Sequence, residues 1–171
     1  MKKDKEMSVK DSINFVRKLF QTSKKPLRDL SPGDLITFSY NAKDKTRVFD
    51  RTPMVLILGV NSKYVLGINF HWCPLRIRKK LVRGLNTLRD DKTKKLSRIN
   101  YKKFKILAKS LMVYPIIRLY IKGRMSSRGV LIPTEHLDAA VLIKSETFTG
   151  GISAEKLYSL ALKGKLGKLK V

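Results

Sequence analysis

The chain has 171 residues, 43% of them hydrophobic, and it carries 38 Lys and Arg against 13 Asp and Glu, a formal net charge of +25. This hydrophobic content is enough for a packed core and excludes a disordered basic tail, and no run approaches the roughly 20 apolar residues of a membrane-spanning helix. A surface with so much positive charge repels itself, so we expect a polyanionic partner: nucleic acid or an acidic protein, and no membrane.

The first predicted element is an amphipathic helix over residues 8–20. Its apolar residues recur at helical spacing: Val9, Ile13, Val16 and Phe20. A polar linker follows and ends in the turn sequence Ser31-Pro32-Gly33-Asp34. We therefore treat residues 1–30 as an N-terminal helix and linker.

Several short strands are predicted after this linker. Residues 35–40 form the first strand. The apolar runs 53–60 and 64–70 flank a three-residue polar break, which is the pattern of a β-hairpin. Another short strand is expected at residues 130–132. These strands predict a small antiparallel sheet or barrel of the SH3-like kind.

Helical periodicity begins after the hairpin. One helix is predicted over residues 74–89, with Pro74 in its first turn, and a second over residues 100–111. The apolar run 116–121 follows the break at Pro115, and we interpret it as a third helix.

The end of the chain is also predicted to be helical. We expect a helix over residues 134–140 with Thr134 as its cap, and a last helix around residues 157–161, before a basic tail over 163–170. The predicted fold class is α+β, an antiparallel sheet with several basic amphipathic helices and helical extensions at both ends. The predicted organisation is an N-terminal helix and linker (1–30), one core domain (31–150) and a C-terminal helix with its basic tail (151–171).

Most of the excess positive charge lies in the middle of the chain. Residues 71–128 contain 18 Lys and Arg and only two acids, Asp90 and Asp91. Phosphate contacts release counterions, so such a surface would bind DNA or RNA strongly and with steep salt dependence. The residues predicted to contact phosphate lie on the polar faces of the first two central helices: Arg76, Lys79, Lys80, Arg83, Lys102, Lys105 and Lys109.

A second basic cluster follows these helices. It combines four cations with two hydroxyl side chains: Arg118, Lys122, Arg124 and Arg128, with Ser126 and Ser127. Backbone amides and hydroxyls beside cations can form an anion pocket, and we add the four cations to the predicted nucleic-acid-binding residues. The alternative is that the cluster is only a charged turn.

Aromatic residues interleaved with the cations have two interpretations. They could stack on bases, as in single-strand binders, or pack in the core. Their helical spacing favours the core: Tyr101, Phe104, Tyr114 and Tyr120.

Catalysis and metal binding are not expected. Cys73 is the single cysteine, which excludes a disulfide framework and a multi-cysteine zinc site. His71 next to it lacks further ligands at zinc spacing, and we assign Trp72 to the core. The acids are scattered, and no phosphate-binding Gly-rich loop with a following Lys-Ser/Thr is present. We predict a non-enzymatic protein without cofactor, metal or small-molecule substrate, made in a reducing compartment.

Three segments resemble one known family. They are residues 50–56 (Asp-Arg-Thr-Pro-Met-Val-Leu), residues 66–74 (Leu-Gly-Ile-Asn-Phe-His-Trp-Cys-Pro) and the Arg-containing helix that follows. Residues 120–136 follow the later pattern of the same family more loosely. The sequence is similar in these segments to the DNA end protector of T-even-type tailed phages, over roughly residues 33–145.

The resemblance implies a virion protein, made in the host cytoplasm, that binds the ends of packaged double-stranded DNA and shields them from host exonuclease. Arg51, Asn69 and His71 are motif positions in it, and we expect them to lock the sheet to the helix, for example by pairing Arg51 with Asp50 or with a backbone carbonyl. One alternative is a structural virion component at the neck, capsid or tail, taking part in head completion or other assembly, which binds packaged DNA without end specificity or an acidic protein. A metal-dependent nuclease is the other alternative.

Overall fold

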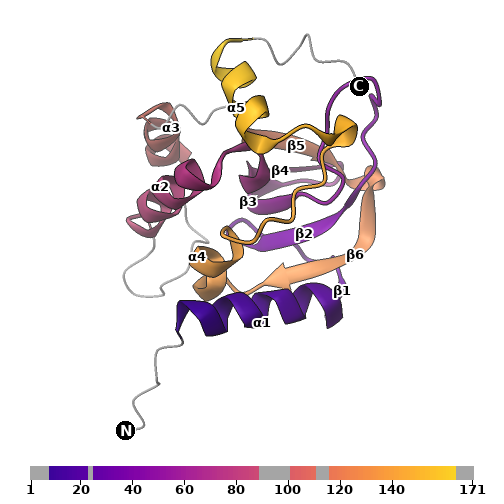
Figure 1. Cartoon of the computed structure of the whole chain (residues 1–171). Coiled ribbons are helices and arrows are strands. Elements are labelled where there is room, and N and C mark those ends of the chain that lie inside the picture. Colours follow the sequence, from indigo (N-terminus) through magenta and orange to yellow (C-terminus); the bar gives the residue numbers. More distant parts are fainter. Residues whose placement is uncertain (1–7, 23–24, 89–100, 111–115, 165–171) are drawn as a thin grey trace, which may run out of the picture.

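A computed structural model describes residues 8–22, 25–88, 101–110 and 116–164. The helices and strands run in the order α1 (Val9–Thr22), β1 (Lys25–Pro26), β2 (Leu35–Tyr40), β3 (Met54–Val60), β4 (Tyr64–Asn69), η1 (Phe70–Trp72), α2 (Leu75–Asn86), α3 (Tyr101–Ser110), β5 (Ile117–Ile121), η3 (Lys122–Arg124), β6 (Met125–Ile132), η4 (Thr134–His136), α4 (Leu137–Ala140), η5 (Thr149–Gly151) and α5 (Ala154–Leu162), where η marks a short 3₁₀ helix. The fold class is α+β with an antiparallel sheet, as predicted (Figure 1).

The sheet has six strands in the order β1-β6-β2-β3-β4-β5, and every pairing is antiparallel. The hairpin expected from the two apolar runs is the pair β3–β4, with Leu56 opposite Ile68. On its other side β3 pairs with β2, so that Leu35 lies between Leu56 and Ile132 of β6. The central strands β2, β3 and β4 thus have neighbours on both sides.

The connection from β5 to β6 requires a strongly curved sheet. These two strands are separated by β2, β3 and β4 in the sheet, yet only the three residues of η3 join them along the chain. Four strand spacings in a flat sheet would cover about 19 Å, whereas the four residue steps from Ile121 to Met125 span at most roughly 14 Å. The sheet must therefore bend until β5 and the start of β6 come close.

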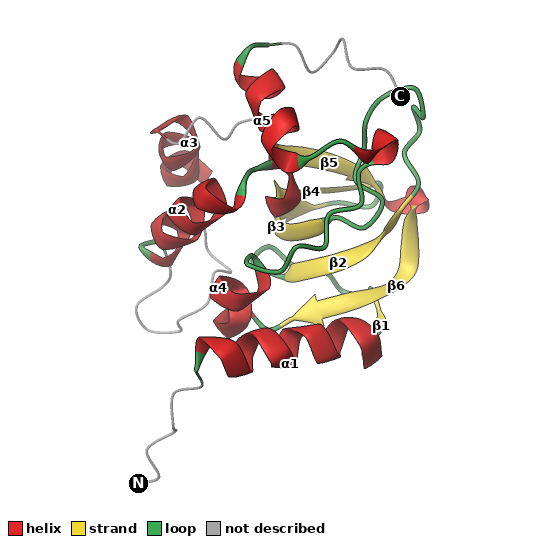
Figure 2. Cartoon of the chain, viewed as in Figure 1, coloured by secondary structure: helices red, strands yellow, loops and turns green. Residues whose placement is uncertain are grey.

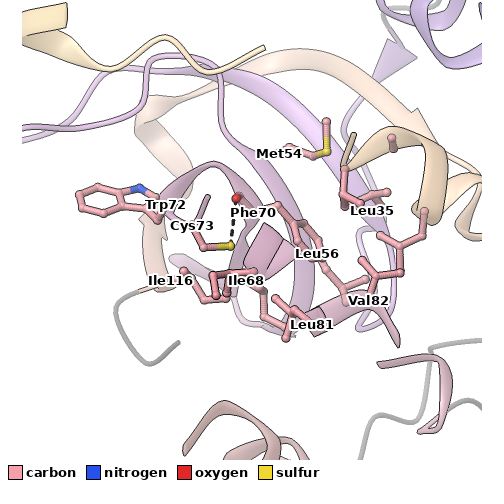
Figure 3. Close-up of a cluster of buried hydrophobic side chains, with 14 of the residues drawn as sticks. Leu35, Met54, Leu56, Ile68, Phe70, Trp72, Cys73, Leu81, Val82 and Ile116 are labelled. Carbon is pink, nitrogen blue, oxygen red and sulfur yellow. Dashed lines mark hydrogen bonds between the residues drawn. The ribbon is translucent and has the colours of Figure 1, made fainter. Parts of the chain in front are cut away.

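Both faces of the curved sheet are buried. One face of β3 presents Met54 and Leu56 to the larger core, which it shares with the helices. The alternate residues Val55 and Ile57 belong to a smaller cluster on the opposite face, with Tyr120 of β5. Successive side chains of a strand point to opposite faces, so burial on both sides makes this strand apolar throughout. Figure 3 shows the larger core between the sheet and α2.

The helices cover the larger core and the sheet margin (Figure 2). α1 packs against β6 and α4, with Val16 fully buried. α5 packs against η1, and its first turn is capped by Ser153, whose hydroxyl accepts from the amide of Lys156. α2 and α3 approach closely at Gly84, where a Cβ atom would lie 2.5 Å from a methyl group of Leu107.

The structure confirms the predicted N-terminal, central and C-terminal helices and corrects one element. Residues 117–121 form the strand β5, so the third helix expected over 116–121 is wrong. The helix expected from residue 134 begins as η4 and continues as α4, whose cap position is His136 instead of Thr134. Three further predicted features lie wholly or mostly outside the described residues: the polar connection with Asp90 and Asp91, the break at Pro115 and the basic tail.

Candidate nucleic-acid interface

The exposed face of α2 carries four of the predicted phosphate contacts. Its apolar residues Ile77, Leu81, Val82 and Leu85 are buried in the core. The other face presents four cations, all exposed: Arg76, Lys79, Lys80 and Arg83. The helix contains no acidic residue, so these side chains form a compact positive surface on a rigid element. We call it the α2 surface.

The α3 cations are described only in part. Phe104 is fully buried and fixes the inner face of this helix. Lys109 is exposed. The side chains of Lys102 and Lys105 lie outside the described residues, so of the predicted α3 set the structure places Lys109 alone.

The second basic cluster lies around the β5–β6 turn. Arg124 and Arg128 are exposed and Lys122 is half-buried. The guanidinium carbon of Arg118 lies 3.5 Å from the ring centroid of Trp72, a cation–π contact, and burial lowers the pKa of Arg118. Arg118 is therefore held against the protein, unlike its neighbours in the cluster.

The two basic groups are not adjacent. In Figure 1, α2 lies on one side of the sheet and the β5–β6 turn lies on the opposite side. The described cations thus form two separate surfaces, where the sequence placed them in one central stretch of the chain.

One cation of the same stretch has an internal role. Arg78 is 1% exposed and donates to the carbonyl oxygens of Cys73 (2.8 Å), Val141 (3.4 Å) and His71 (3.5 Å). It also forms an ion pair with Glu146. The side chain therefore ties α2 and η1 to the loop after α4, and it takes no part in the α2 surface.

The motif residues form a buried polar network. Nδ1 of His71 lies 2.7 Å from a carboxylate oxygen of Asp50. Asn69 donates to the same oxygen (3.1 Å) and to the hydroxyl of Tyr120 (3.0 Å), and its own side-chain oxygen accepts from the amide of His71 (2.9 Å). The network therefore joins β4, η1 and β5 to the segment before β3.

The expected pairing of Arg51 with Asp50 is wrong. Asp50 points inward to His71, whereas the side chain of Arg51 is exposed. Neighbouring residues in an extended segment point to opposite sides, which separates these two side chains. Asn69 and His71 do have a locking role, but within the sheet and its following loop.

Ser145 extends the network into a Ser-His-Asp chain. Its hydroxyl lies 3.0 Å from Nε2 of His71. If the imidazole is neutral, Nδ1 donates to Asp50 and Nε2 accepts from Ser145. The connectivity is that of a hydrolase triad, which also requires donors for an oxyanion and access to the histidine. His71 has no exposed surface. We therefore interpret the hydrogen bonds that join Ser145, His71 and Asp50 as structural.

The loop that contains Ser145 pairs with the segment before β3. The hydroxyls of Thr52 and Thr147 lie 2.6 Å apart. The amide of Arg51 donates to the carbonyl of Thr147 (3.1 Å), and the amide of Thr149 donates to the carbonyl of Phe49 (3.0 Å). Residues 145–149 therefore form a short, strand-like partner for residues 49–52.

The environment keeps the buried Asp50 and the half-buried Glu146 ionised. Burial alone would raise the pKa of Asp50, but the hydrogen bond and charge of His71, with hydrogen bonds from Asn69 and Thr52, lower it. Burial opposes ionisation of Glu146 as well, and a backbone hydrogen bond and Arg78 lower the pKa of that acid. These acids serve internal partners.

Cys73 does not provide a reactive thiol. It is fully buried, and burial raises its pKa to about 12. Its sulfur lies 3.4 Å from the carbonyl oxygen of Phe70, the contact drawn in Figure 3. Within the described residues, no group of three or more His, Cys, Asp or Glu side chains is placed to hold a metal ion.

The aromatic residues whose side chains are described lie in the core, which is the interpretation that their spacing favoured. Phe104, Tyr120 and Trp72 are each at most 4% exposed. The side chain of Tyr101 and all of Tyr114 lie outside the described residues. Among the helices described, none is long and apolar enough to cross a bilayer.

Comparisons with known proteins add no relative to this picture. A scan against protein-family models, a search of curated proteins and a search of solved structures each found no match.

Proposed function

We propose that this protein binds double-stranded DNA through the α2 surface, without catalysis. The observation that carries the proposal is the set of four exposed cations on one acid-free helix whose opposite face is anchored in the core. Lys and Arg on such a face contact phosphates and position a duplex without reading its sequence. Lys109 is an exposed cation of α3, the helix that packs against α2.

We further propose that the sheet is an SH3-like barrel. Two observations support this: the three-residue connection from β5 to β6 and the second apolar cluster on the sheet face opposite the larger core. A small barrel of this kind supplies a rigid platform for the helices that carry the cations.

The resemblance to phage DNA end protectors supports a more specific role. In that role the protein travels in the virion with other virion proteins, and it occupies the last turns of the genome so that a host exonuclease has no access. Steric occupancy is sufficient for protection, which agrees with the internal use of His71, Asp50 and Ser145.

Exonuclease digestion of linear duplex DNA in the presence of the protein tests this role. Binding to blunt linear and closed circular DNA is measured in parallel over a salt series. We expect protection and a preference for the linear form. Equal, steeply salt-dependent binding without protection would contradict end protection and leave general DNA binding.

One observation favours a second candidate, a structural virion component. The β5–β6 turn presents a second positive surface on the opposite side of the sheet from α2, so the protein could connect packaged DNA to an acidic protein of the particle. Loss of DNA binding near physiological salt, together with binding to an acidic virion protein, would replace the first candidate with this one.

A further inference from the structure

Three adjoining clefts form a continuous groove beside β2 and the β5–β6 turn. The largest, about 810 Å³, is lined by residues that include Tyr40, Phe49, Arg51 and Arg124. It shares Tyr40 and Phe49 with a cleft of about 210 Å³ that reaches Arg118. Its other end shares Ser39, Thr52 and Ser126 with a cleft of about 350 Å³ that reaches Arg128. We call this sequence of clefts the β2 groove.

The electrostatics of the β2 groove favour an anionic occupant. Arg51 and Arg124 are exposed, and their side chains have no hydrogen bond or ion pair with any described residue. The acid nearest along the chain, Asp50, lies at the base of the smallest cleft with its carboxylate already bonded to His71 and Asn69. Two arginine side chains therefore face the largest cleft without an acidic partner in it.

The groove also carries half-buried aromatic rings. Tyr40 and Phe49 pack edge to face with ring centroids 6.5 Å apart, and Tyr40 packs in the same way on Tyr120, with centroids 5.0 Å apart. Tyr40 packs against the smaller core, and both rings are half-buried and line the largest cleft. Aromatic platforms next to cations are the features with which proteins bind unpaired bases and the strand that joins them.

The backbone is irregular where Ser39 and Ser126 line the groove. The pairing of β2 with β6 shifts register between Phe38 and Tyr40. At this bulge the amide of Ser39 donates to the hydroxyl of Ser126 (3.0 Å) in place of a strand carbonyl. Bulges of this kind are common beside functional sites because they redirect side chains.

We propose that the β2 groove binds a short single-stranded segment of nucleic acid, with Arg51 and Arg124 on its phosphates and Tyr40 and Phe49 against its bases. This site is separate from the α2 surface, since none of the residues that line the three clefts belongs to α2. The proposal extends the proposed DNA binding: the groove takes an unpaired strand, and the α2 surface takes the duplex.

The test measures fluorescence anisotropy of two labelled probes with the full chain. One probe is oligo-dT of roughly 10 nucleotides, within the range that small single-strand-binding folds cover, and the other is a blunt duplex. Two variants each remove two cations: R51A/R124A in the groove and K79A/K80A on the α2 surface. All four residues are exposed, so both variants should keep the wild-type thermal midpoint.

We expect each variant to weaken the binding of one probe and to leave the binding of the other nearly unchanged. R51A/R124A should weaken oligo-dT binding about tenfold and reduce its salt slope by about 1.4, since each single-strand phosphate contact contributes roughly 0.7. The same variant should change duplex binding little. K79A/K80A should weaken duplex binding and change oligo-dT binding little. Photo-crosslinking with 5-iodo-deoxyuridine in the oligonucleotide should map to Tyr40 or Phe49.

The measured outcomes distinguish a wrong groove proposal from a wrong α2 proposal. Duplex binding without oligo-dT binding, or crosslinks that map to α2, would overturn the groove and leave the α2 proposal. If both variants weakened the binding of both probes equally, the groove proposal would also be overturned. That result would mean that one diffuse positive surface binds both probes. Oligo-dT binding that depends on Arg51 and Arg124, without duplex binding, would support the groove and overturn the α2 proposal; binding of neither probe would overturn both.

Discussion

Nδ1 of His71 lies 2.7 Å from a carboxylate oxygen of Asp50, and the two side chains are 0% and 1% exposed. They are 21 residues apart in the chain. The pair is the centre of the network that joins the segment before β3, the end of β4 and the loop around Ser145. A buried carboxylate is tolerated only where hydrogen-bond donors compensate for its lost hydration, so its donors are expected to be important for stability.

The Asp50→Asn variant tests this directly. The amide keeps the shape of the side chain but replaces an acceptor with a donor that faces His71 and Asn69. Because hydrogen bonds to a charged group contribute more than neutral ones, we expect a loss of about 2 kcal/mol in the free energy of unfolding, measured by urea denaturation. Asp44→Asn, an exposed acid paired with Arg47, is the matched control and should leave the midpoint unchanged.

Stability should also depend on pH in the acid range. The folded state lowers the pKa of Asp50 from 3.8 and of Glu146 from 4.5. Acids with a lowered folded-state pKa contribute stability that is fully present above the unfolded pKa and lost as the pH falls through the folded one. The free energy of unfolding should therefore stay level above about pH 5 and decrease below it. The same titration of Asp50→Asn should show a smaller decrease, and an unchanged curve would contradict the assignment.

Arg78 should behave unlike its neighbour Arg76. Arg78→Met removes a buried side chain that bonds three carbonyls and leaves Glu146 without its cation. Because the change leaves three carbonyls without this buried donor and a half-buried acid without its cation, we expect a loss of about 3 kcal/mol. Arg76→Met changes an exposed position on the same helix and should leave thermal stability within experimental error while weakening DNA binding. Equal stability losses would contradict the internal assignment of Arg78.

Glycine positions in the β3–β4 hairpin should differ sharply in their tolerance of alanine. A Cβ atom at Gly67 would lie 2.2 Å from a methyl group of Val55 and 2.7 Å from the carbonyl oxygen of Leu56. Gly67→Ala should therefore destabilise the sheet by about 1–3 kcal/mol through overpacking. Gly59→Ala meets no atom within 4 Å and serves as the control, with little change expected in the thermal midpoint.

The α2 surface can be tested with a charge-matched pair of variants. Lys79/Lys80/Arg83→Ala removes three exposed cations from α2 and should weaken duplex binding by a few kcal/mol, with a salt slope reduced by about 3. Lys10/Arg17/Lys18→Ala removes three exposed cations from α1 and should reduce affinity much less. Equal effects of the two variants would mean that net charge, and not the α2 surface, determines binding.

The sequence was sufficient to predict the elements whose hydrophobic pattern lies within one short segment. The hairpin of β3 and β4 and the buried stripe of α2 follow from periodicity within a few residues. The strand β5 was mistaken for a helix because a short apolar run has no clear period. It is a strand because residues 117–121 find their partners on β4, some 50 residues earlier.

The candidate site was predictable only where exposure follows from periodicity. Arg76, Lys79, Lys80 and Arg83 are exposed as the helical pattern of α2 requires. Arg78 lies among them in the chain, and only the later loop with Glu146 explains its burial. The β2 groove was not predictable from the sequence, because most of its lining residues come from two segments, 37–52 and 117–130, that are far apart in the chain.

The pairing of β2 with β6 also determines the order in which the sheet can be completed. Leu35 is opposite Ile132, so one edge of β2 has no strand partner until about three quarters of the 171 residues have been synthesised. Contacts this distant along the chain slow folding, and an unpaired strand edge readily pairs with another molecule. A nascent or truncated chain that ends before residue 125 therefore exposes an aggregation-prone edge at β2, and the late arrival of β6 is the step that protects it.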